Sequence, residues 1–129
     1  MTSLTQPVPS PAPSPGPQLT IRVSEVSGAV VVRQAGEAGV VEVPRLQLPF
    51  MRLVVRRAPL VVLDLSELTY ISSLALGAVV ALRRNLGHFG GRVMIAAALP
   101  RVSGVLETTR LHTLFGVYAT VEEALAAGQ

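Results

Sequence analysis

Several residue types are absent from this 129-residue chain, and each absence excludes a kind of chemistry. There is no cysteine, so disulfides, thiol catalysis and cysteine–metal sites are excluded. The two histidines, His88 and His112, are too few for a metal cage, and we expect neither a metal nor a cofactor. There is no lysine either, which excludes a phosphate-binding P-loop.

Charged and aromatic residues are scarce, at 15% and 4%, whereas half of the chain is hydrophobic. The chain is therefore long and apolar enough for one domain with an aliphatic core. All eleven basic residues are arginines, which raises the pI to about 10.6 although the net charge is only +3. They are scattered apart from two adjacent pairs, without interleaved aromatic residues, so we expect no nucleic-acid partner.

Long hydrophobic runs are also lacking. The longest uncharged apolar run, Leu74 to Leu82, is far shorter than the roughly 20 residues that a membrane-spanning helix needs. The first residues do not show the basic-then-apolar order of a signal peptide. We therefore expect a cytoplasmic protein without membrane insertion.

Proline occupies every second position from Pro7 to Pro17. Such a segment has little to bury and favours an extended chain, so we expect residues 1–18 to form a disordered leader and residues 19–129 to form one domain. The leader is either a flexible linker or, through its SPAPSP pattern, a ligand for an aromatic groove.

The domain is expected to alternate strands and helices. A hairpin is predicted at 19–33, with its turn at Ser27-Gly28, and a helix mainly at 50–57, because Pro49 would break an earlier start. The remaining predicted elements are strands at 60–65, 92–98 and 116–119, and helices at 74–86, 100–109 and 120–128. This order, strand-strand-helix-strand-helix-strand-helix-strand-helix, predicts an α/β fold with a mixed sheet packed against helices.

The segment LTYISSLALG, residues 68–77, places two serines between a buried strand and a helix. No Gly-x-Ser-x-Gly elbow surrounds Ser72 or Ser73, and the carboxylates show no paired spacing. We therefore predict no catalytic residues and no enzyme activity. Either serine could cap the helix, and the same place would suit a phosphate, since a helix start favours negative charge.

Three stretches resemble the STAS domain of bacterial anti-sigma factor antagonists: VVLDLSELTYISSLALGAVVAL, GGRVMIAA and PRVSGVLETTRLHTLFGVYATVEEAL. The resemblance runs from about Leu19 to Ala127. It implies a STAS-like sheet and a partner-switching pathway that regulates transcription. In that pathway an anti-sigma factor serine kinase binds the unphosphorylated antagonist and releases the phosphorylated one.

The resemblance also implies roles for particular residues. Ser73 stands at the phosphoacceptor position, with Ser72 beside it as the second candidate. Ser72 and Gly39 stand where the family usually has aspartate, so a kinase that reads those carboxylates would not recognise this site. The implied partner-binding residues are Asp64, Ser72, Ser73, Leu74, Leu76 and Gly77.

Two functions stay open. The first is an antagonist-like interaction module whose partner is the kinase or a related regulatory protein. The second is a phosphorylation-independent STAS subunit or scaffold of a transporter, lipid-trafficking or signalling complex. A small-molecule or nucleotide sensor has no sequence motif to support it.

Overall fold

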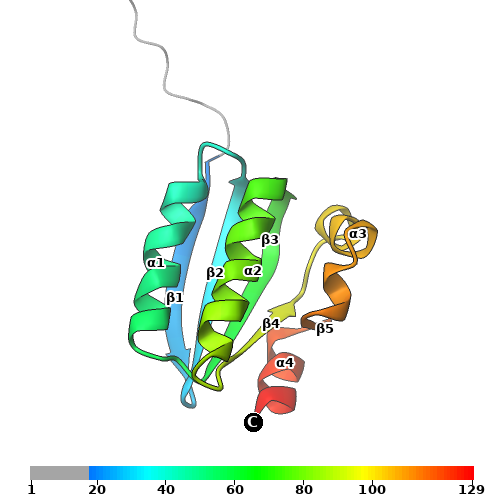
Figure 1. Ribbon diagram of the computed structural model, residues 1–129. Coiled ribbons are helices and arrows are strands. Elements are labelled where there is room, and N and C mark those ends of the chain that lie inside the picture. The colour runs from blue at the N-terminus through cyan, green and yellow to red at the C-terminus, as the bar shows by residue number, and fades with distance from the viewer. Residues whose placement is uncertain (1–17) are drawn as a thin grey trace, which may run out of the picture.

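The computed structural model describes residues 18–129, and its elements follow the predicted order (Figure 1). The disordered leader predicted at 1–18 lies outside the described residues, apart from Gln18. The strands are β1 (Thr20–Val26), β2 (Ala29–Ala38), β3 (Leu60–Ile71), β4 (Arg92–Ala96) and β5 (Gly116–Tyr118). The helices are α1 (Val43–Val55), α2 (Ser73–Gly87), α3 (Pro100–Thr108) and α4 (Val121–Gly128), with a short 3₁₀ turn at Leu111–Thr113.

The five strands form one mixed sheet in the order β1-β2-β3-β4-β5, in which only β1 runs antiparallel to its neighbour. The predicted α/β fold is thus confirmed. Alternate residues of β3 enter two cores, because successive side chains of a strand point to opposite faces. Val61 and Leu63 pack with α1, α2 and α3, whereas Leu60 and Val62 pack with α4.

The β1–β2 hairpin closes where the sequence predicted. Ser27 and Gly28 both have positive φ, at 52° and 83°, as a two-residue turn with the twist of the flanking strands requires. Paired residues run from Val26 with Ala29 to Thr20 with Ala35.

The expected start of the first helix was wrong. α1 begins at Val43 rather than near Phe50, and Pro49 lies inside it. Pro44 occupies the first turn, where a missing N–H costs nothing, and Pro49 removes one further backbone hydrogen bond. Leu46, Phe50 and Leu53 are buried on both sides of Pro49, so packing of this face offsets the lost bond.

β3 extends six residues beyond its predicted end, because Gly36 to Ala38 of β2 continue to pair with it. Register shifts after Arg33 and after Gly36 interrupt this pairing. The last pair, Ala38 with Ile71, brings the ends of the two strands together immediately before Ser72.

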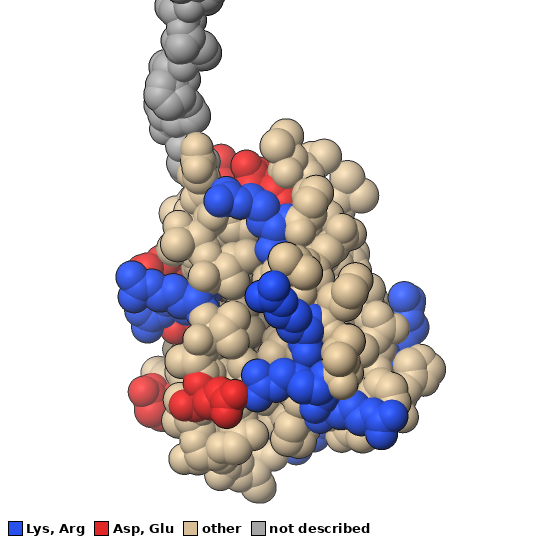
Figure 2. Space-filling view, turned by 90° about the vertical axis from the view of Figure 1, so that its left-hand side faces the viewer, with Lys and Arg blue, Asp and Glu red and all other residues tan. Residues whose placement is uncertain are grey.

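Basic side chains gather on the side of the molecule that β1 and α1 form (Figure 2). Arg45 and Arg52 of α1 and Arg56, its C-cap, lie seven and four residues apart, and therefore on the same flank of the helix. Of the three, only Arg56 forms an ion pair within residues 18–129, with Glu25 of β1.

Two negative findings concern residues 18–129. None of the helices formed there has the length and hydrophobicity to cross a membrane. In the same residues, no three His, Cys, Asp or Glu side chains gather closely enough to hold a metal ion.

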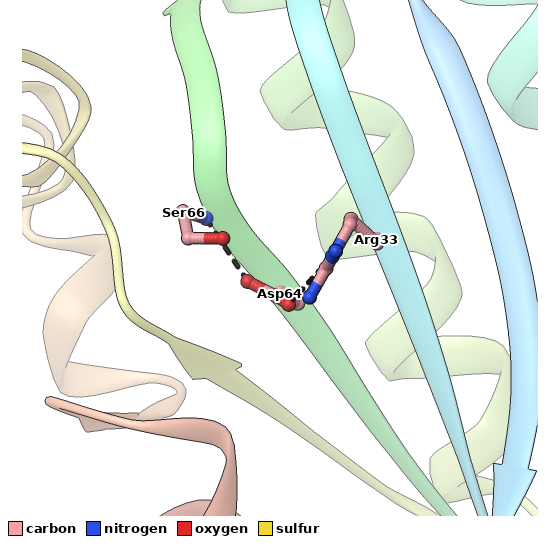
Figure 3. Close-up of polar contacts among 3 residues, drawn as sticks. All are labelled: Arg33, Asp64 and Ser66. Carbon is pink, nitrogen blue, oxygen red and sulfur yellow. Dashed lines mark hydrogen bonds and ion pairs between the residues drawn. The ribbon is translucent and has the colours of Figure 1, made fainter.

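An ion pair ties β2 to β3 in the middle of the sheet (Figure 3). Arg33 Nε donates to Asp64 Oδ2 at 3.1 Å, and the Ser66 backbone N–H donates to Oδ1 at 3.0 Å. The Asp64 side chain is 3% exposed and that of Arg33 48%. Burial alone raises the pKa of Asp64, but the hydrogen bonds from Ser66 and Arg33 outweigh it and hold this pKa below its ordinary value of 3.8.

We predict that Asp64→Asn makes stability less dependent on pH in acid. The folded-state pKa lies below 3.8, so the carboxylate's contribution is complete above that pH and is lost as pH falls through the folded-state pKa. Urea midpoints measured from neutral pH down to about pH 3 should fall less for the variant than for wild type. Glu67→Gln, an exposed carboxylate on the same strand, is the control and should keep the wild-type slope. Parallel wild-type and Asp64→Asn curves would contradict the assignment.

Candidate functional site

Ser72 joins three elements at one end of the sheet. Its backbone N–H donates to the Ala38 carbonyl at 2.9 Å, and its own carbonyl accepts from the Leu76 N–H at 2.9 Å. Its hydroxyl oxygen accepts from the Ala75 N–H at 3.1 Å, which makes Ser72 the N-cap of α2. Ser72 is only 4% exposed, so its side chain is committed to the fold.

Ser73 is placed very differently, although it is the next residue. It is the first residue of α2 and is exposed. Its hydroxyl has no hydrogen-bond partner among residues 18–129. The structure thus gives the two serines separate positions, with Ser72 as the buried cap and Ser73 as a free hydroxyl at the start of a helix.

The other predicted contact residues are likewise divided between exposed and buried positions. Leu74 is 56% exposed, and Gly77 is exposed with open space where a side chain would project. Ser73 and Gly77 are four residues apart, so they share one face of α2. Leu76 instead packs in the core. Asp64 lies further back on β3, roughly 25 Å from Ser72. The roles of all these residues in binding stay predictions.

Three exposed apolar residues near Ser73 were missed by sequence reasoning. Val40 and Val41 are 58% and 83% exposed in the turn that follows β2. Tyr70, 41% exposed, precedes the Ile71–Ala38 pair that joins the two strand ends. The sequence did hold one signal of these exposed apolar residues, because two adjacent valines follow Gly39 where a polar loop is expected. We refer to these three residues and Leu74, all exposed and all close in the chain to the Ala38–Ser72 junction, as the Ser73 apolar patch.

A carboxylate lies close to this patch despite the glycine at position 39. A Cβ placed on Gly39 would be 2.9 Å from Glu42 Oε1, so the Glu42 side chain folds back over Gly39. Gly39 is adjacent to Ala38, whose carbonyl accepts the Ser72 N–H. The site therefore has an acidic group, and it comes from Glu42, three residues after Gly39.

We predict that Ser72→Ala and Ser73→Ala differ in their effect on stability. Ser72→Ala removes the acceptor of the buried Ala75 N–H and should lower the free energy of unfolding by about 1 kcal/mol. Ser73→Ala removes an exposed, unpaired hydroxyl and should change it by less than about 0.5 kcal/mol. Urea unfolding at neutral pH measures both, and equal effects would contradict the division between cap and free hydroxyl.

Comparisons with known proteins bear on this arrangement. Among solved structures, an anti-sigma factor antagonist from Mycobacterium paratuberculosis is 29% identical, with a TM-score of 0.79 and coverage of 85% of this chain and 93% of that one. SpoIIAA in its unphosphorylated form is 23% identical, with a TM-score of 0.72 and coverage of 82% and 93%. The phosphorylated form of SpoIIAA, a Bacillus cell fate determinant, is 21% identical, with a TM-score of 0.68 and coverage of 85% and 100%. The two SpoIIAA structures establish likeness of fold.

The sequence itself matches a family model. The model for the STAS domain matches residues 20–124, a segment that contains all five strands, the first three helices and the first half of α4. The chain therefore belongs to the STAS domain family.

Proposed function

We propose that this protein is a regulatory binding module of the anti-sigma factor antagonist type, which releases its partner when Ser73 is phosphorylated. The observation that carries the proposal is the exposed Ser73 hydroxyl at the start of α2, beside the Ser73 apolar patch. A partner that covers the patch would bury this hydroxyl. The partner proposed is an anti-sigma factor serine kinase or a related cytoplasmic regulatory protein.

The physical consequence of a phosphate at Ser73 is local. It would add about −1.5 to −2 charges at a helix start, where free N–H groups and the helix dipole favour negative charge. The cap is supplied by Ser72, so α2 would stay intact. The same charge within an apolar contact costs desolvation, and the interface would separate while the domain stays folded.

The absence of aspartate at positions 39 and 72 is compatible with this proposal. Glu42 supplies a carboxylate over Gly39, which a kinase can recognise by charge. Residue 72 is a serine rather than an aspartate. A phosphate on Ser73 would therefore meet less electrostatic repulsion from the neighbouring residue.

We predict that phosphate is found on Ser73 and not on Ser72 in protein isolated from its native cells. Only the Ser73 hydroxyl is exposed, whereas Ser72 is buried. Mass spectrometry of the tryptic peptide 58–83, with fragmentation between the two serines, measures this directly. Phosphate on Ser72 would overturn the assignment. Unmodified peptide under every growth condition would overturn the switch and favour the phosphorylation-independent subunit.

We predict that Ser73→Glu and Leu74→Arg each weaken partner binding by about tenfold or more, since each places a charge in the Ser73 apolar patch. Affinity capture with wild type identifies the partner, and titration calorimetry then compares the variants. Ser24→Glu, which adds the same charge at an exposed position of β1, is the matched control and should bind as wild type does. Unchanged binding by Leu74→Arg would exclude the patch as the contact surface.

A further inference from the structure

A pocket of about 430 Å³ lies between the C-terminal half of α2, the start of β4, and β5 with the turn before it. We call it the arginine pocket, because Arg83 and Arg84 of α2 and Arg92 of β4 all line it. Arg83 follows Ser73 by ten residues along α2, roughly 15 Å, so the pocket and the Ser73 apolar patch lie toward opposite ends of the helix.

The charge of the residues that line this pocket is positive. No Asp or Glu is among its lining residues. The two ion pairs that join residues in the described part of the chain involve Arg33 and Arg56, so Arg83, Arg84 and Arg92 have no carboxylate partner there. Arginine keeps its charge at any pH at which the protein is folded. Three arginines that line one concave surface therefore attract anions to it.

The arginines also have hydrogen-bond donors to spare. Arg83 is held by one bond, from its Nε to the Leu114 carbonyl at 2.8 Å, and its guanidinium lies 5.9 Å from the centre of the Phe115 ring. This anchoring leaves its terminal nitrogens without a partner in residues 18–129. Arg92 donates through one terminal nitrogen to the Gly128 carbonyl at 3.4 Å, and Arg84 has no partner there.

Compensation of the helix dipole explains only part of this cluster. Arg84 lies in the last turn of α2, where positive charge is favourable. Arg83, however, binds the Leu114 carbonyl rather than a carbonyl of its own helix, and Arg92 comes from a strand. Two consecutive elements, α2 and β4, thus bring their arginines to one pocket.

Tyr118 adds a further donor to the same pocket. A Cβ on Gly116 would lie 2.9 Å from the Tyr118 hydroxyl and 2.8 Å from its ring, so the ring occupies space that a side chain at 116 would fill. Leu114 and Met94 contribute apolar surface, and His88 completes the polar side. The pocket thus has many donors and a smaller apolar part, and its volume is within the range of small-molecule sites.

We infer that the arginine pocket binds a small molecule through a phosphate or diphosphate group. Guanidinium groups pair with phosphate oxygens through two parallel hydrogen bonds, and three of them match a multiply charged group better than a carboxylate. Leu114 and Tyr118 are placed to contact the organic part. This site is separate from the proposed contact surface at Ser73 and does not depend on that proposal.

The test is a titration of the full chain, labelled with ¹⁵N, with inorganic pyrophosphate and with ADP at physiological salt. Saturable shifts at the Gly87, Gly91 and Tyr118 amides are expected. Arg84→Gln and Arg92→Gln should each weaken binding by about tenfold, since each removes a charged donor. Both arginines are exposed, so the variants should fold. Arg52→Gln on the basic flank of α1 is the matched control and should bind as wild type does.

The outcomes separate the sources of the phosphate group. Equal affinity for pyrophosphate and ADP supports a site that reads phosphate alone, and tighter binding of ADP supports a contact with the organic part. The inference would be overturned by no saturable shift with either probe, by equal weakening from Arg52→Gln, or by shifts spread over α1. Equal binding of sodium sulfate at the same concentration would also overturn it, because it would show nonspecific anion attraction.

Discussion

The hydrogen bonds of Ser72 are the constraint on which the rest of the site depends. One residue joins the end of β2, through Ala38, to the first turn of α2, through Ala75 and Leu76. If the chain were shifted by one residue at this junction, the Ser73 hydroxyl would face the core and Ala75 would no longer be buried in it. Helix capping and solvent exposure are thus divided between two neighbouring serines.

Under the proposed switch at Ser73, this division lets a phosphate act on binding and spare the fold. A residue that both caps the helix and accepts phosphate would lose its capping bond when modified. Here the capping oxygen belongs to a residue that is 4% exposed, beyond the reach of another protein in the folded state. The exposed hydroxyl next to it makes no hydrogen bond to any of residues 18–129.

Much of the fold could be predicted from the sequence, because the local patterns agree with the final packing. The apolar run 60–65 indicated a strand buried on both faces, and Ser27-Gly28 indicated the hairpin. The last helix was predicted from residue 120, and Thr120 is its N-cap, with a hydroxyl that accepts the Glu123 N–H at 3.1 Å. α1 was missed in part, because the rule that proline breaks helices was given more weight than the helical spacing of Leu46, Phe50 and Leu53.

The parts of the site that escaped prediction depend on long-range geometry. Which of two adjacent serines caps a helix depends on the length of the preceding strand, and β3 continues well past its apolar run because β2 pairs with it. In the sequence Arg83 and Arg84 stood out only as an adjacent pair, and nothing in the local sequence indicated that Arg92 would lie beside them. Glu42 reaches Gly39 only because the turn before α1 folds back.

The shortness of β5 has a consequence for how the molecule opens. Only Gly116 to Tyr118 pair with β4, whereas β2 and β3 are joined along most of their length. Local unfolding is cheapest where few hydrogen bonds and little apolar surface hold an element, so amide exchange should be fastest at this edge and slowest in β2 and β3. The Ser72 junction lies on the slow side of this gradient, whereas Leu114 and Tyr118 lie on the fast side. The part of the sheet formed by β2 and β3 thus stays closed, whereas the β5 edge opens locally more often.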